Sequence, residues 1–439
     1  MSEQTLPERW APRFFTIWIG QAFSLLGSGL VQFALVWWLT IETRSPTVLA
    51  GATLVAMLPM VLLGPIAGPL IDRWNRRLIM IVADGLIALA TLWLIVVFSI
   101  GATEVWHVYA VLMIRSAAGA FHMPSMTAST SLMVPKEQLS RVAGLNQTLQ
   151  GITSILSPAL GALLLSLFEV RAVLAVDVVT ALLAILPLFF IAIPQPPRRV
   201  MSATGQKSSF MQDLRAGLRY VARWPGLLAI ILMAMLLNFL VNPAFALLPL
   251  LVTTRFAGDA GLLATLEALF GIGVIVGGIV LSAWGGFRKR VFTSMMGLIG
   301  LGLGIVAIGV TSAEFVWLAV AGMFLVGAMQ SMANGPLFAV LQSVVAPDMQ
   351  GRVLSLLHSG ATAMSPLSLL VAGPIADALG VPVWYGVGGV ACMLMGALGF
   401  FVPAIVHLED NHAQPAQSEA TSEALRPEAA QPSEVTEMI

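Results

Sequence analysis

The chain has 439 residues, of which 58% are hydrophobic and only 10% are charged. Soluble globular proteins carry about 25% charged residues, so this composition excludes a cytosolic enzyme. The 22 basic and 22 acidic residues cancel to zero net charge, which gives no general attraction to nucleic acid. The single cysteine, Cys392, excludes an internal disulfide, a cysteine-rich zinc site and an iron-sulfur cluster.

Twelve apolar stretches are long enough to cross a bilayer, whose core of about 30 Å needs roughly 20 residues per helix. We expect them at about 14–40, 47–71, 78–100, 107–127, 146–168, 172–193, 225–251, 260–284, 291–312, 315–335, 353–376 and 383–407. The stretches are continuously apolar rather than alternating, which excludes an outer-membrane barrel. The sequence therefore predicts an all-α integral membrane protein with 12 transmembrane helices.

The chain also shows an internal repeat. The segment from Pro124 to Arg141 resembles the segment from Pro336 to Arg352, and each contains two prolines eleven positions apart. Two six-helix halves explain this similarity, and chance similarity between apolar segments is the alternative. We predict an N-terminal half at 1–193, a central loop at 194–224, a C-terminal half at 225–407 and a tail at 408–439. The tail is rich in Pro, Ala, Ser and Glu, a composition typical of disorder.

The distribution of basic residues predicts the orientation, because positively charged loops stay in the cytoplasm. One side of the predicted topology carries eighteen Lys and Arg residues and the other side carries three. We therefore place both termini and the central loop in the cytoplasm. Within that loop one helical face is apolar, which predicts an amphipathic helix on the inner membrane surface. Its apolar residues are Phe210, Leu214, Leu218 and Val221.

A polar motif follows the second predicted helix. It reads GPLIDRWNRR, and its distinctive residues are Gly68, Asp72, Arg73, Arg76 and Arg77. A glycine lets helices approach closely, and a carboxylate can accept hydrogen bonds from a facing helix N-terminus. The spacing resembles the loop 2–3 signature of the major facilitator superfamily, with Asn75 in place of the usual glycine. The resemblance implies a gating role for these five residues.

Arg115 lies within the fourth predicted helix, with Gly119 and His122 on the same face. A buried arginine needs an acidic partner or a watery cavity. The Arg-x-x-x-Gly spacing is similar to the helix-four motif of drug:proton antiporters, and helix five carries a degenerate antiporter motif at Ser157 to Gly161. The segments WIGQAFSLLGS, IRSAAGAFHMP and VPKEQLSRVAGLNQ resemble bacterial macrolide efflux permeases. This resemblance covers about residues 13–407 and implies the major facilitator fold in a bacterial inner membrane.

Three acidic residues lie within predicted helices. Asp84 is near the cytoplasmic end, so we expect a structural ion pair with a loop arginine such as Arg76 or Arg141. Asp177 and Glu267 lie deeper, and an apolar environment favours the protonated form of a carboxyl group. We take Asp177 and Glu267 as candidates for proton coupling, tuned by the charge of Arg115, and a fixed ion pair is the alternative for each. We interpret His122 as a hydrated histidine near the inner end, and a proton relay is the alternative.

Polar side chains at helical spacing indicate a substrate cavity between the halves. The candidates are Gln21, Ser28, Gln32, Gln147, Gln150, Asn238, Asn242 and Asn334. Helix-to-helix hydrogen bonding is the alternative for each one alone. Few fixed charges among many Met, Phe and Leu residues favour a large amphiphilic solute.

The sequence carries no nucleotide-binding loop, metal cluster or catalytic triad, so we expect no cofactor and no enzymatic activity, and an ion gradient must drive any uphill transport. We expect a monomeric, proton-coupled exporter of hydrophobic or amphiphilic small molecules in contact with membrane lipids. Two alternatives remain: a siderophore or lipid exporter on the same scaffold, and a membrane sensor or assembly partner that does not transport.

Overall fold

The computed structural model describes residues 10–71, 73–193 and 210–409, and every regular element in these ranges is a helix. The first six long helices are α1 (Trp10–Thr43), α2 (Pro46–Ile71), α3 (Arg76–Ser99), α4 (Val105–Met133), α5 (Leu139–Leu167) and α6 (Val170–Phe190). The others are α8 (Pro225–Ala246), α10 (Ala260–Trp284), α11 (Arg290–Val310), α12 (Val316–Val344), α13 (Pro347–Leu379) and α14 (Pro382–Gly399). Three shorter helices are α7 (Phe210–Ala222), α9 (Leu248–Thr254) and α15 (Pro403–Val406). The C-terminal tail beyond residue 409 lies outside the described ranges.

Eleven of these helices are long and apolar enough to cross a membrane. The twelfth long helix, α4, is less apolar because it carries Arg115, His122 and several Ser and Thr residues. The predicted segment 225–251 is two helices rather than one, since α8 ends at Ala246 and α9 begins at Leu248. Pro249, at the start of α9, has no backbone N–H to continue the hydrogen-bond ladder of α8.

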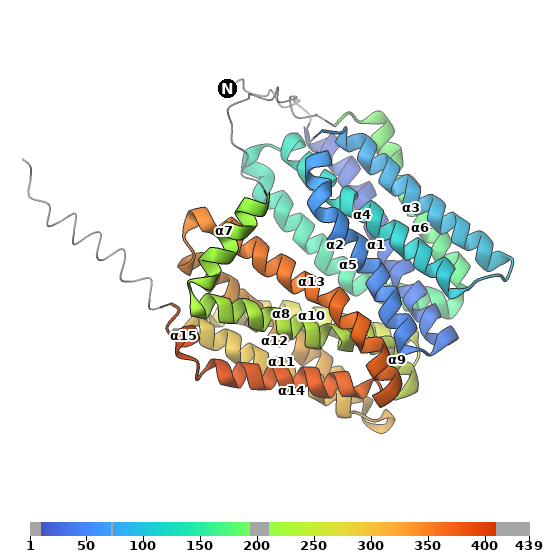
Figure 1. The fold of residues 1–439 in the computed structure, drawn as a ribbon. Helices are drawn as coiled ribbons and strands as arrows, with labels where there is room; N and C mark the ends of the chain where they lie inside the picture. The colour runs from blue at the N-terminus through green and yellow to red at the C-terminus, as the bar shows by residue number, and fades with distance from the viewer. Residues whose placement is uncertain (1–9, 72, 194–209, 410–439) are drawn as a thin grey trace, which may run out of the picture.

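The long helices pack in two groups, which we call the N-terminal bundle (α1 to α6) and the C-terminal bundle (α8 to α14) (Figure 1). In the N-terminal bundle α1 packs on α5 and α6, and α4 packs on α2 and α3. In the C-terminal bundle α12 packs on α10 and α11, and α8 packs on α13 and α14. Contacts between the bundles run mainly through α2 with α13 and α5 with α10.

Glycine allows the tightest of these contacts. A Cβ at Gly277 of α10 would lie 2.2 Å from the carbonyl oxygen of Ala328 in α12, and one at Gly327 would lie 2.1 Å from that of Phe270. Small residues at such crossings let two helix backbones approach closely, which is how helices associate in a membrane.

A buried apolar cluster of the described residues joins the two bundles at one end. At the end that carries α9, a single apolar cluster joins both bundles and includes Leu39, Leu112, Leu251 and Ile308. At the opposite end, which carries α7, the buried clusters of the two bundles are separate. We call these the α9 end and the α7 end. The interface is therefore closed at the α9 end.

Helix α7 packs against α13 and α8 at the α7 end. Val221 is buried beside Leu227 and Val353, and Leu218 is exposed. The side chains of Phe210 and Leu214 lie outside the described residues. Helix α7 thus rests on the C-terminal bundle through Val221, a contact that the amphipathic pattern alone does not predict.

Gly373 of α13 lies close to Thr47 of α2 in the contact between the bundles. A Cβ at Gly373 would lie 2.7 Å from the Cα of Thr47 in α2, and the Thr47 hydroxyl donates a hydrogen bond to Asp377 one turn further along α13. We expect Gly373→Val to force α2 and α13 apart and to shift the population toward an opened α9 end. A cysteine at the buried position Leu39, in a Cys392→Ser background, should then react several-fold faster with a hydrophilic thiol reagent.

Gly386→Val is the matched control for this substitution, because a Cβ at Gly386 meets nothing within 4 Å. Equal labelling rates for Gly373→Val and Gly386→Val would show that Gly373 does not maintain the closure.

Candidate functional site

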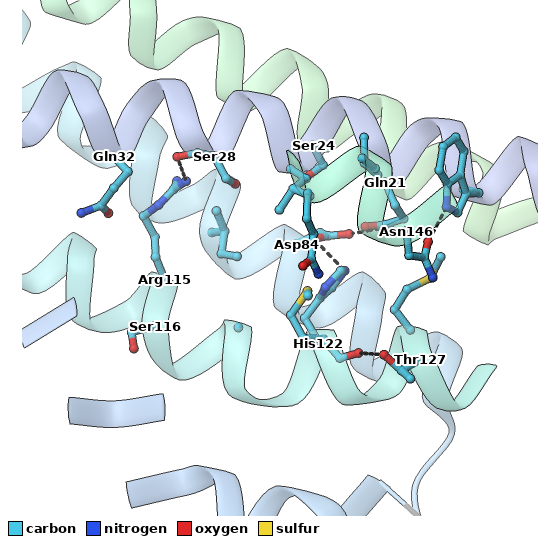
Figure 2. Close-up of a pocket in the computed structure, with 18 of the residues that line it drawn as sticks. Gln21, Ser24, Ser28, Gln32, Asp84, Arg115, Ser116, His122, Thr127 and Asn146 are labelled. Carbon is cyan, nitrogen blue, oxygen red and sulfur yellow. Dashed lines mark hydrogen bonds and ion pairs between the residues drawn. The ribbon is translucent and has the colours of Figure 1, made fainter. Parts of the chain in front are cut away.

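A cavity of about 410 Å³ lies inside the N-terminal bundle, lined mainly by α1, α3, α4 and α5 (Figure 2). Its apolar wall includes Trp18, Leu25, Ile87, Leu112, Met123 and Met126. Its polar wall includes Gln21, Ser28, Gln32, Asp84, Arg115, His122, Asn146 and Gln150. The mixture of aromatic, thioether and amide groups suits an amphiphilic molecule, because small-molecule sites combine an apolar lining with a few placed polar groups.

Arg115 and Asp177 form an ion pair at one end of the cavity. We call this pair and the hydroxyl groups bound to it the outer layer. The Arg115 Nη1 atom lies 2.5 Å from Oδ2 of Asp177, and the two side chains are 9% and 1% exposed. The hydroxyl of Thr91 donates to the same carboxylate oxygen at 3.0 Å, and that of Ser28 donates to Oδ1 at 3.3 Å. Both oxygens of Asp177 are therefore occupied. Asp177 itself lies outside the cavity lining, so Arg115 is the member of the pair that faces the cavity.

Asp84 forms the inner polar layer with Gln21 and His122. The amide of Gln21 donates to Oδ2 of Asp84 at 3.0 Å, and Nε2 of His122 lies 3.2 Å from Oδ1. Asp84 is 3% exposed and the His122 side chain 14% exposed. Figure 2 shows Asp84 and His122 joined by a dashed line, with Arg115 at a distance from both.

The two layers are related by a spacing of seven residues on each of three helices. Ser28 and Gln21 are seven apart on α1, Thr91 and Asp84 on α3, and Arg115 and His122 on α4. Seven residues are two turns, about 10 Å along a helix. Each layer thus combines a cationic or basic side chain of α4 with a carboxylate and a polar residue of α1.

A second cavity, of about 680 Å³, lies between the two bundles and contains Glu267. The other lining residues from the C-terminal bundle are Phe245, Ala246, Pro249 and Leu263. It shares Leu25, Ser28, Gln32, Met123 and Gln150 with the first cavity, so the two spaces are continuous. Among the described residues, no hydrogen-bond or ion-pair partner is found for the Glu267 carboxylate. Glu267 is thus a carboxyl group without a partner at the bundle interface.

The cavity residues proposed from the sequence divide into two groups. Gln21, Ser28, Gln32 and Gln150 line the cavities. Gln147 is exposed outside both of them, because the helix turns its neighbour Asn146 inward instead. Asn238 donates to a carbonyl of its own helix, Asn242 donates to Ser365 of α13, and Asn334 is exposed. The last three residues line neither cavity, so the polar wall comes almost entirely from the N-terminal bundle.

The predicted pairing of Asp84 with a loop arginine is wrong. Arg141 is exposed and donates to Gln138 at the start of its own helix. Asp84 instead faces Gln21 and His122, because α3 presents it to the bundle interior rather than to the membrane surface. The interpretation of His122 as a merely hydrated residue is wrong for the same reason.

The loop motif lies at the α7 end of the N-terminal bundle. Arg77 donates to carbonyl oxygens of Leu188 and Phe189 at the end of α6, and Arg76 donates to that of Ala128 in α4 at 2.8 Å. Arg73 is exposed, and Asp72 lies outside the described residues. A Cβ at Gly68 would meet nothing within 4 Å, so the close helix contact expected there is not found among the residues that the structure describes.

Two functional contacts escaped the sequence reasoning. The indole N–H of Trp18 donates to Asn146 of α5 at 2.7 Å, and Thr91 joins the outer layer. Trp18 precedes Gln21 by three positions, so the polar periodicity of α1 was a signal that could have included it. No comparable signal marks Thr91, which lies among apolar residues of α3.

These features define a polytopic helical membrane transporter with a continuous cavity in its core. The sequence profile of the Major Facilitator Superfamily matches residues 17–368, and the chain belongs to this superfamily. It is 35% identical over 380 residues to macrolide efflux protein A of Streptococcus pyogenes, covering 87% of this chain and 93% of that protein. It is 24% identical over 399 residues to the multidrug efflux pump Tap of Mycolicibacterium fortuitum, covering 87% of this chain and 94% of that protein.

The fold is also similar to that of solved transporters. A crystal structure of a peptide transporter POT superimposes with a TM-score of 0.71 at 11% identity, covering 90% of this chain and 95% of that one. At this identity the likeness concerns the fold. The predicted family and the all-helical membrane fold are thus confirmed.

Proposed function

We propose that this protein is a secondary active exporter that moves hydrophobic or amphiphilic small molecules, macrolides among them, in exchange for protons. The observation that carries the proposal is the continuous cavity between the bundles, which has an apolar wall, a few amide groups and ionisable side chains inside the membrane span. Such ionisable groups are costly in a membrane and are typical of transport pathways. The similarity to macrolide and multidrug efflux proteins supports the substrate class.

The conformation fits the loading step of export. The excess of Lys and Arg at the α7 end favours a cytoplasmic location for that end. With the α9 end closed, the cavity is then accessible from the cytoplasm. Rocking of the N-terminal and C-terminal bundles about the cavity would close the α7 end and open the α9 end, which is alternating access.

Two carboxyl groups have different parts in this proposal. Among the described residues Glu267 has no hydrogen-bond or ion-pair partner, and it lies where the bundles meet, so it can gain and lose a proton as the interface opens and closes. Asp177 is held by Arg115, Thr91 and Ser28, so we assign it to holding α1, α3, α4 and α6 together. Of the proton-coupling candidates, Glu267 is therefore the residue we assign to the exchange.

Transport in inverted membrane vesicles tests this function. An inward-acidic pH gradient should drive accumulation of a radiolabelled macrolide, and collapse of the gradient with a protonophore should release it. A panel that includes cationic dyes and siderophores defines the substrate class. Absence of gradient-driven uptake for the whole panel, with the protein present in the membrane, would contradict the proposed function.

A further inference from the structure

The inner layer of Asp84, Gln21 and His122 has no part in the mechanism so far. Asp84 is a buried carboxylate whose only contacts given by the described residues are a neutral amide and an imidazole. A buried charge is costly unless it is paired. The imidazole pairs with it only when protonated, and Nε2 of His122 makes no hydrogen bond of good geometry despite its 3.2 Å distance. In its neutral form His122 therefore leaves Asp84 without a countercharge.

Among the residues that the structure describes, the neighbouring helices supply no other cation to Asp84. Arg115 of α4 is engaged by Asp177 of α6 two turns away, and α2 carries no charged residue between Pro46 and Ile71. Arg76 of α3 reaches Ala128 of α4, and Arg13 and Arg141 are exposed at the starts of α1 and α5. Asp84 is thus the acidic group that the first cavity presents without a fixed cation.

The rest of the cavity wall fits an organic cation. Trp18 lines the cavity with Met123 and Met126, and its indole is held by Asn146. An aromatic face attracts an ammonium group within about 6 Å, and thioether side chains accommodate irregular apolar groups. A charge-assisted hydrogen bond from an ammonium N–H to a carboxylate is about twice as strong as a neutral one.

We propose that Asp84 binds the protonated amine of an amphiphilic substrate, and that protonated His122 competes with the amine for the same carboxylate. This rests on the proposed export function and assigns the group that recognises the substrate's charge. Imidazole changes its charge between pH 5 and 8. A neutral imidazole at His122 leaves Asp84 to the ammonium, and an imidazolium takes the place of the ammonium. One bound cation replaces another, so the charge of the layer is conserved.

Binding to the purified full-length protein in lipid nanodiscs tests the site. The probes are a macrolide with a dimethylamino sugar and the same ring without that sugar. We expect the wild type to prefer the amine by roughly tenfold at pH 8, which corresponds to about 1.4 kcal/mol, because a hydrogen bond to a charged group is stronger than a neutral one. Asp84→Asn keeps an acceptor for Gln21 and should abolish the preference while still binding the neutral ring. Glu314→Gln, an exposed acid outside the cavity, is the control and should keep it.

The competition with His122 gives a second readout that does not depend on the Asp84 variant. Wild-type affinity for the amine should fall several-fold from pH 8 to pH 6, while His122→Gln should keep its affinity. Equal wild-type affinity for the two probes would overturn the Asp84 site, and an unchanged pH dependence in His122→Gln would overturn the competition by His122. Either result would leave the export function standing. If neither probe binds the wild type, the proposed substrate class fails, and the inference fails with it.

Discussion

Replacing Glu267 with glutamine should abolish pH-driven accumulation of substrate in inverted vesicles but leave downhill exchange intact. Glutamine has nearly the same shape as glutamate and does not titrate, so the cavity keeps its form and loses the exchangeable proton. Accumulation should fall to the level seen with a protonophore, whereas exchange of labelled for unlabelled substrate should continue at a rate near that of the wild type.

The control for this variant is Glu169→Gln. Glu169 is an exposed acid that pairs with Arg171 at the start of α6, far from the cavity lining. The Glu169→Gln variant should leave pH-driven accumulation of substrate unchanged. If Glu267→Gln keeps full pH-driven accumulation, or if it loses expression and every form of flux together, Glu267 is not the coupling residue.

Breaking the Arg115 and Asp177 pair should have the largest effect on stability. Removing one partner of a buried ion pair leaves the other charge without compensation and costs about 3 to 5 kcal/mol. We therefore expect Asp177→Asn and Arg115→Met each to lower the free energy of unfolding by about 3 kcal/mol. The double variant Arg115→Met with Asp177→Leu should recover most of this loss, since it leaves no unpaired charge. Unfolding in mixed detergent micelles, followed by circular dichroism, measures all three.

The same experiment distinguishes a fixed pair from a coupling pair. If Asp177→Asn unfolds like the wild type and only pH-driven transport is lost, Asp177 exchanges protons rather than holding the helices together. If the double variant is less stable than either single variant, the Arg115 and Asp177 side chains contribute more to the free energy of unfolding than the cancellation of their two charges.

The number and position of the long helices could be predicted from the sequence because a bilayer demands long, continuous apolar runs. The predicted fourth helix, 107–127, shows the limit of that signal. Helix α4 extends to Met133, because its last turns face the bundle interior and carry Ser125 and Ser129, which are buried there. Hydropathy locates the helix segments that contact lipid, and it misses helical turns that contact other parts of the protein.

The site was only partly predictable, for a different reason. The polar periodicity of α1 places Gln21 and Ser28 on one helical face, and both line the cavity. The contact of Asp84 with His122 depends on how α3 and α4 are rotated against each other, and no local sequence signal records that rotation. Basic loop residues such as Arg141 therefore looked like better partners than a histidine in the next helix.

Proton movement coupled to substrate movement tests the central claim most directly. The purified protein is reconstituted in sealed liposomes that contain a pH-sensitive dye and are loaded with a macrolide. The liposomes are then diluted into medium without macrolide. Substrate leaving through the protein should draw protons in, so the interior should acidify in proportion to the substrate that leaves, and Glu267→Gln should release substrate without acidification. Substrate efflux by the wild type with no change in interior pH would contradict proton antiport.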